Sequence, residues 1–151
     1  MPQKRNKNNG KKSHKKNQKS YDVMDIFIQN PAQKISALSP SLSPKEQIFE
    51  LLISYCDILN ETRDQSLASL DIASFQKHPC LLKECADMLL SKLTFKKTIP
   101  FLTDIGFTIL LIDILKTWRD DDSRDLSKTM AKLDKRLTQI DGIMLKLKVA
   151  A

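Results

Sequence analysis

The sequence predicts an all-α protein, an antiparallel bundle of about five helices preceded by a disordered basic N-terminal tail. Apolar residues recur at helical spacing in several segments, most regularly in residues 120–148, and no segment alternates with the two-residue period of a strand. The chain of 151 residues is long enough for one domain with its own core. We divide it into the tail (1–20), a short helix and linker (21–42) and the bundle (43–148).

The positive charge of the chain is concentrated in the tail. The whole chain has 25 Lys and Arg against 18 Asp and Glu, whereas residues 1–20 contain no acid. We expect this polar segment to be disordered, either as a solubilising leader or as a non-specific contact with nucleic acid. The basic residues available for such a contact are Lys4, Arg5, Lys7, Lys11, Lys12, Lys15, Lys16 and Lys19.

For residues 21–42 we predict one short helix followed by a linker. Tyr21 to Gln29 can form a helix that ends at the Asn30-Pro31 pair, and the prolines and serines that follow indicate a linker. The inward side of this helix is apolar: Val23, Ile26 and Phe27.

Ser43 begins the helix whose start is most clearly marked. Ser43 can cap it, Pro44 suits its first position, and Glu46 completes a capping box. One apolar stripe follows, which we expect to be buried up to a stop near Asn60: Ile48, Leu51, Leu52, Tyr55, Ile58 and Leu59. A weaker helix is predicted over 62–76, before the His78-Pro79 break.

Two further helices are predicted over 79–95 and 99–118. The second of these is apolar on most faces, so we expect it to lie centrally with neighbours on several sides. Gly106 in its middle costs about 1 kcal/mol relative to alanine, which favours a close approach by a neighbouring backbone or a ligand. Asp104 and Asp113 interrupt this segment, so we expect a buried helix and no membrane span.

The last helix, in residues 120–148, has an apolar seam with alternating gaps of four and three residues. Its members are Leu126, Met130, Leu133, Leu137, Ile140, Met144 and Leu147. This 3.5-residue period is typical of a helix packed along its length on another helix, in this chain or in a second copy. The period alone leaves open which of the two supplies the partner surface. Four acids at the start of the helix are expected to be caps and dipole partners: Asp120, Asp121, Asp122 and Asp125.

The sequence contains no catalytic motif or phosphate-binding loop, so we expect neither an enzyme nor a cofactor. The spacing of His78, Cys80 and Cys85 fits no tetrahedral metal site. With only three cysteines and no secretory signal, we expect the protein to be cytoplasmic. Several bulky residues either pack the core or line an apolar cavity for a hydrophobic molecule or lipid: Tyr55, Phe75, Met88, Phe101, Ile105 and Phe107.

Two stretches resemble the regulatory domain of TetR-type transcription regulators. They are SPKEQIFELLISYCDIL and LLIDILKTWRDDDSRDLSKTMAKLDKRL. The similarity covers about residues 43–148 and is strongest to an alphaproteobacterial branch and to the helical lipid-binding protein of ubiquinone biosynthesis. The motif residues of the second stretch are Trp118, Asp121, Asp122, Ser123, Thr129, Met130, Ala131, Leu133, Asp134, Arg136 and Leu137.

The resemblance implies a domain whose last two helices pair with the same helices of a second subunit, so we predict that the seam from Leu126 to Leu147 forms a homodimer interface. It also implies an apolar ligand pocket among the middle helices. Such regulators carry a helix-turn-helix unit before this domain, and the residues before Ser43 do not predict one. We therefore expect a dimeric ligand-sensing or interaction module without its own operator reader. A lipid- or quinone-binding accessory protein and a nucleic-acid-associated protein remain the alternatives.

Overall fold

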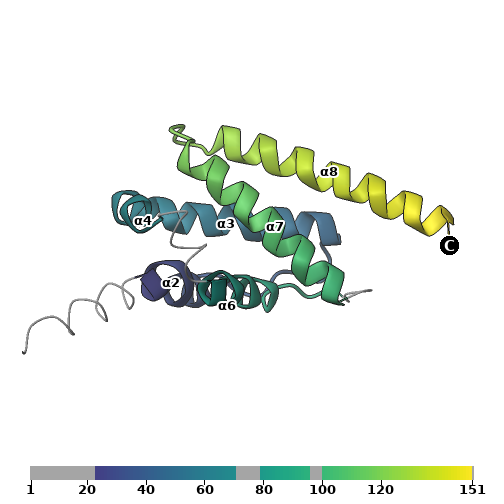
Figure 1. Ribbon diagram of the computed structural model, residues 1–151, viewed down its shortest axis with the longest axis horizontal. Coiled ribbons are helices and arrows are strands. Elements are labelled where there is room, and N and C mark those ends of the chain that lie inside the picture. Colours follow the sequence, from purple (N-terminus) through teal and green to yellow (C-terminus); the bar gives the residue numbers. More distant parts are fainter. Residues whose placement is uncertain (1–22, 71–78, 96–99, 151) are drawn as a thin grey trace, which may run out of the picture.

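The structure is a computed structural model that describes residues 23–70, 79–95 and 100–150, and in the last range the side chains of residues 104–142. Every regular element over these residues is helical, which confirms the all-α prediction (Figure 1). The elements are the π-helical turn η1 (Asp25–Gln29), α2 (Asn30–Lys34), α3 (Pro44–Glu61), α4 (Arg63–Ser69), α6 (Pro79–Leu90), α7 (Pro100–Arg119) and α8 (Ser127–Ala150).

Helix α3 runs through the centre of the molecule and contacts α2, α4, α7 and α8. In Figure 1, α8 lies on one side of α3, and α2 and α6 lie on the other. Helix α7 crosses the bundle and contacts α3, α6 and α8. A short turn reverses the chain between α7 and α8, so these two helices run antiparallel. Buried side chains of these helices form one core, whose largest members are Trp118, Tyr55 and Phe27.

The start of α3 confirms the sequence prediction. The Ser43 hydroxyl accepts the Glu46 N–H at 3.3 Å, and the Glu46 carboxylate accepts the Ser43 N–H at 2.8 Å. Pro44 is the first residue of the helix, where its missing N–H costs nothing. Most of the predicted stripe is buried: Leu51, Leu52, Tyr55, Ile58 and Leu59.

The N-terminal prediction was wrong in two respects. The helix does not end at Asn30-Pro31 but continues as α2 to Lys34, with Pro31 in its first turn and buried. The following residues are not a free linker, because Ile35 is buried and the Leu38 N–H donates to the Lys92 carbonyl at 3.0 Å. Burial of this segment on the bundle outweighs the local tendency of proline to stop a helix. We call residues 23–38 the N-terminal strap.

The remaining boundaries differ from the predictions mainly at helix ends. α4 ends at Ser69 and α6 at Leu90, so both are shorter than predicted, whereas α7 lies within a residue of its predicted bounds. Helix α7 has neighbours on several sides, as predicted, namely α3, α6 and α8. One face of α7 is nevertheless open, because Ile105 is 43% and Ile109 62% exposed. Gly106 on this face is exposed too, and a Cβ placed there would meet nothing within 4 Å. The predicted close approach at Gly106 is therefore absent within the described subunit.

Of the helices that the structure describes, none is long and apolar enough to cross a membrane.

Candidate functional site

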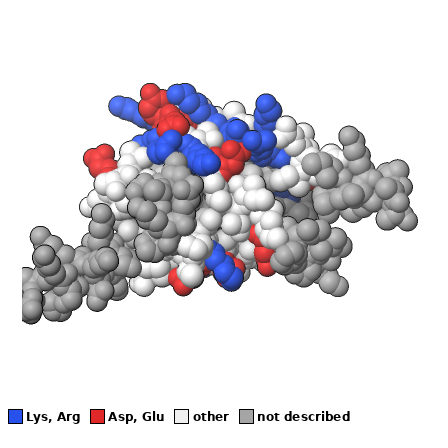
Figure 2. Space-filling view, in the orientation of Figure 1, with Lys and Arg blue, Asp and Glu red and all other residues white. Residues whose placement is uncertain are grey.

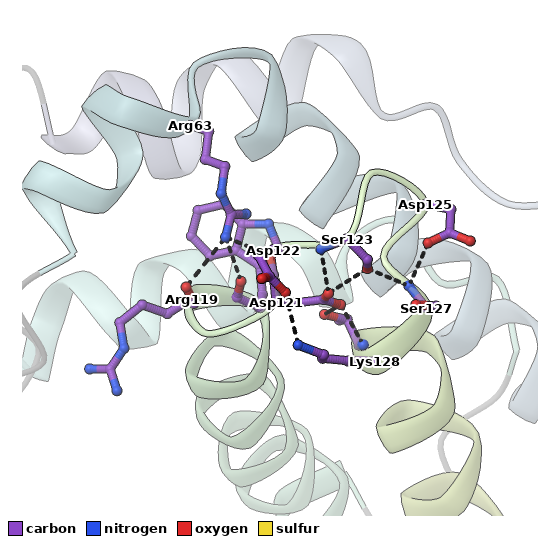
Figure 3. Close-up of polar contacts among 10 residues, drawn as sticks. Arg63, Arg119, Asp121, Asp122, Ser123, Asp125, Ser127 and Lys128 are labelled. Atoms are coloured by element: carbon purple, nitrogen blue, oxygen red, sulfur yellow. Dashed lines mark hydrogen bonds and ion pairs between the residues drawn. The ribbon is translucent and has the colours of Figure 1, made fainter.

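The turn between α7 and α8 is organised around one buried carboxylate. Asp121 is only 1% exposed. Its Oδ1 accepts the N–H and the hydroxyl of Ser123 at 3.1 and 2.5 Å, and its Oδ2 accepts the N–H and the hydroxyl of Thr129, both at 2.8 Å (Figure 3). Thr129 lies in the first turn of α8, so Asp121 satisfies one of the amide groups that a helix leaves unpaired at its start. Asp121 is therefore a cap, as the sequence predicted.

Two opposing effects set the charge of Asp121. Burial raises the pKa of the carboxyl group, but the hydrogen bonds from Ser123 and Thr129 outweigh burial and hold the pKa at about 2. Asp121 is consequently ionised at neutral pH, beside the positive end of the α8 dipole. A carboxylate held this firmly in one protonation state is suited to a structural role and not to general acid–base chemistry.

Arg63, which the sequence analysis did not single out, closes the other side of this turn. Its guanidinium donates to the carbonyls of Trp118, Arg119 and Asp121 at 3.2, 3.3 and 2.7 Å. These carbonyls lie at the C-terminal end of α7, where a cation is favoured by the helix dipole. The guanidinium also lies 4.8 Å from the centroid of the Trp118 ring.

Asn60 joins the same cluster from the end of α3. Its Oδ1 accepts the Arg63 Nη1–H and the Trp118 indole N–H, both at 2.9 Å. We call the six residues of this cluster the turn lock: Asn60, Arg63, Trp118, Asp121, Ser123 and Thr129. The turn lock ties the end of α3, the start of α4 and the end of α7 to the start of α8. Among the described residues it leaves no buried side-chain polar atom without a hydrogen-bond partner.

The other acids of the turn are exposed surface groups. Asp120 pairs with Arg119 at 3.0 Å, and Asp122 with Lys128 at 2.8 Å. Asp125 accepts the Ser127 N–H at 3.3 Å, as part of the cap of α8. Across the described ranges, no three His, Cys, Asp or Glu side chains are placed to hold a metal ion. The turn therefore has the geometry of a helix junction.

Ion pairs fix the first half of α8 to its own subunit. Asp113 on α7 pairs with Arg136 at 2.6 Å and with Lys132 at 3.7 Å. From α3, Lys45 donates to the Thr138 hydroxyl at 2.9 Å and lies 3.5 Å from Asp134. Figure 2 shows the resulting surface, where Lys and Arg gather with interspersed acids on one side of the molecule.

The predicted dimer seam is divided by the structure. Leu126, Leu133 and Leu137 are buried in the core of their own subunit, and Met130 is half-buried against it. A side chain already covered by its own chain has no surface left for a partner, so assigning these three leucines to a dimer interface was wrong. Ile140, in contrast, is 41% exposed. The side chains of Met144 and Leu147 lie outside the described residues.

Among the side chains described on the last two helices (104–119 and 127–142), three isoleucines are exposed, and we call them the isoleucine surface: Ile105, Ile109 and Ile140. The Asp113–Arg136 ion pair sets the register of α7 against α8. Ile109 lies four residues before Asp113, and Ile140 lies four residues after Arg136. Because the helices are antiparallel, both isoleucines are about one turn, ~6 Å, from the ion pair in the same direction. They therefore lie at the same height on neighbouring helices.

The residues predicted to line an apolar cavity differ in their burial. Phe107 is buried in the core and Met88 is half-buried against it, while Ile105 is exposed and cannot line an enclosed pocket. Phe75 and the side chain of Phe101 lie outside the described residues, as do all the basic residues of the tail.

Tyr55 has a more specific environment. Its hydroxyl donates to the Phe27 carbonyl at 2.9 Å and lies 3.0 Å from the Cys85 sulfur, and all three residues are fully buried. This contact joins α3 and α6 to the N-terminal strap. Sequence reasoning found Tyr55 from its place on the apolar stripe, but nothing in the spacing of residues indicated its partner.

Comparisons with protein families, with curated proteins and with solved structures found no match to this chain.

Proposed function

We propose that the protein is a homodimeric helical domain of the TetR regulatory type, which senses a ligand or binds a partner. The observation that carries the proposal is the isoleucine surface. Exposed isoleucines on two adjacent antiparallel helices offer an apolar face that a second copy can cover across a two-fold axis, and such isologous pairing is the commonest form of oligomer.

The length of α8 supports a contact beyond the subunit. Lys45, the second residue of α3, reaches Thr138, so α8 passes the beginning of α3 at this point. The residues that follow, 138–142, are all exposed, and the helix continues to Ala150 beyond the rest of the bundle (Figure 1). A helix that extends into solvent with apolar residues at seam positions gains stability when another helix covers it.

Four residues of the turn lock also belong to the motif that resembles the TetR family. Trp118, Asp121, Ser123 and Thr129 belong to that motif, and together they set the junction between the two helices that would meet the second subunit. A rigid junction favours dimerisation because less conformational freedom is lost on binding.

The proposal predicts the effect of charges on the isoleucine surface. The double variant Ile109→Asp/Ile140→Asp should raise the dimer dissociation constant by about 100-fold or more, because two buried apolar contacts are replaced by buried charges. Sedimentation equilibrium on the full chain measures the dimer dissociation constant. The control is Ala131→Asp, which places the same charge at an exposed position on the opposite face of α8.

A wild-type protein that stays at the 17.3 kDa mass of one chain at ~100 μM would reject the dimer. A dimer that the double variant leaves as tight as the control would place the interface elsewhere and reject the isoleucine surface as its basis.

A further inference from the structure

The N-terminal strap covers the face of the bundle that α3 and α6 form. Three residues of the strap, Phe27, Pro31 and Ile35, are buried against this face. Within the strap, η1 contacts α6 and α2 contacts α3. The other side of the strap faces solvent, where its exposed residues are Asp25, Gln29, Gln33, Lys34, Ser36 and Ala37. The strap is thus an amphipathic segment laid on an apolar surface.

Two polar side chains of that surface are directed at the strap. The Tyr55 hydroxyl donates to the Phe27 carbonyl at 2.9 Å, and the Cys85 sulfur lies 3.6 Å from the same oxygen. The strap therefore presents both an aromatic ring and a carbonyl oxygen to a buried tyrosine hydroxyl.

We propose that the strap closes a ligand site, and that this site accepts an apolar molecule with a hydrogen-bond acceptor, such as an aromatic ketone. Phe27 shows what fits, because its ring fills the apolar part and its carbonyl satisfies Tyr55. A ligand that displaces the strap and supplies both features restores the Tyr55 hydrogen bond to an oxygen, whereas a ligand without an acceptor leaves this hydroxyl only the Cys85 sulfur, which is a weak acceptor. An apolar pocket with one or two placed polar groups is the usual composition of a small-molecule site. This inference rests on the ligand-sensing part of the proposed function.

The strap is the part of the described bundle best suited to open alone. It consists of two five-residue helical pieces and an extended segment. Beyond Tyr55, the described polar contacts that hold the strap to the body include the Lys34–Glu61 ion pair, the Lys92 ammonium on the Ala32 carbonyl and the Leu38 amide on the Lys92 carbonyl. Short segments with half-exposed surfaces open at lower free energy than packed core helices. Opening would leave the contacts of α3 with α7 and α8 intact.

The three cysteines report on this opening in the wild-type chain. Cys80 is exposed, Cys85 is buried beneath the strap, and Cys56 is buried on α3 beside the turn lock. Burial raises the pKa of the Cys85 thiol to about 12, so Cys85 reacts only after it is uncovered. We expect iodoacetamide to label Cys80 first, then Cys85 through local opening, and Cys56 only through global unfolding, as measured by peptide mass spectrometry. Equal rates for Cys85 and Cys56, with the same dependence on urea, would overturn the proposal.

The variant Tyr55→Phe removes the hydroxyl while keeping the ring. It should label Cys85 about tenfold faster in the absence of urea, and that labelling should keep the weak urea dependence of a local opening. Cys85 labelling that acquires the steep urea dependence of Cys56 would show that Cys85 is uncovered only by global unfolding and would reject a local role for this contact.

The chemical class of the ligand is tested with acetophenone, and with ethylbenzene as the control that lacks an acceptor. Acetophenone should increase hydrogen exchange of the strap amides, because it displaces the strap. It should also slow the labelling of Cys85, because the bound molecule covers the apolar surface that the strap has left. Ethylbenzene should do neither, and Tyr55→Phe should abolish the difference. An acetophenone effect no larger than that of ethylbenzene would reject the site. Neither readout depends on oligomeric state, so failure of the dimer proposal would be seen separately, by sedimentation.

Discussion

The two halves of α8 carry one continuous apolar pattern and have opposite surroundings. In the first half, Leu133 and Leu137 are buried against the subunit's own helices. Ile140 follows Leu137 on the same seam and is 41% exposed. The difference teaches that a heptad period identifies a face fit for burial but does not say which chain covers it. The position of α3 determines which part of α8 is covered by the same chain, because α8 passes the beginning of α3 at Thr138.

The largest expected difference between the two halves of α8 comes from truncating one apolar side chain in each half. Leu133→Ala should lower the free energy of unfolding by about 3 kcal/mol at any protein concentration, because it leaves a cavity in the core. Ile140→Ala should change the stability of the dilute monomer by less than about 0.5 kcal/mol and weaken only the dimer. Urea unfolding at low and high protein concentration measures both. Equal losses for the two variants in dilute solution would contradict the division of α8.

The turn lock should make the first half of α8 sensitive to acid. The pKa of Asp121 is lowered in the folded protein to about 2, so its contribution is full above the unfolded pKa near 3.8 and is lost as pH falls through 2. Asp121→Asn should remove about 2 kcal/mol at pH 7. The variant should also show less stability loss between pH 5 and 2 than the wild type, measured by thermal unfolding. A wild type and variant that lose stability in parallel over this range would contradict the role assigned to Asp121.

The ion pairs between α7 and the first half of α8 should contribute less. Asp113→Asn removes the pairing with Arg136 and Lys132, which are partly exposed, so we expect a loss of about 0.5–1 kcal/mol that shrinks in high salt. Lys83 and Asp87 form an exposed pair within α6, and Asp87→Asn is the matched control with a smaller effect. A loss that is independent of salt would indicate packing instead of charge.

The smallest change tests the open face of α7. Gly106→Ala should stabilise the dilute protein by about 0.5–1 kcal/mol, because alanine favours the helix and the added Cβ meets nothing within 4 Å. Thermal unfolding of the dilute chain checks this. A destabilised monomer would show that the face is covered within the subunit, against the open α7 surface described above.

The sequence predicted the features that depend on local chemistry. The capping box at Ser43, the buried stripe of α3 and the bounds of α7 follow from neighbouring residues and helical spacing, and the structure confirms them. The role of Asp121 as a cap was predictable as well, because acids before a helix start serve that purpose.

The features that sequence reasoning missed depend on contacts between distant segments. Arg63 is an ordinary surface-type residue in a weakly marked helix, and only the fold brings it to the carbonyls that end α7. The continuation of the helix through Pro31 likewise depends on burial against α3 and α6. The prediction that a second subunit covers the leucines of α8 came from the family resemblance, because periodicity alone cannot distinguish a partner chain from the rest of the same chain.

Hydrogen exchange along α8, followed by mass spectrometry at ~1 μM and ~100 μM protein, tests the central claim most directly. The account predicts that the amides of residues 130–137 are equally protected at both concentrations, while those of residues 140–147 become more protected as the protein is concentrated. Protection that changes to the same extent in both halves, or in neither half, would contradict an α8 shared between its own subunit and a second copy.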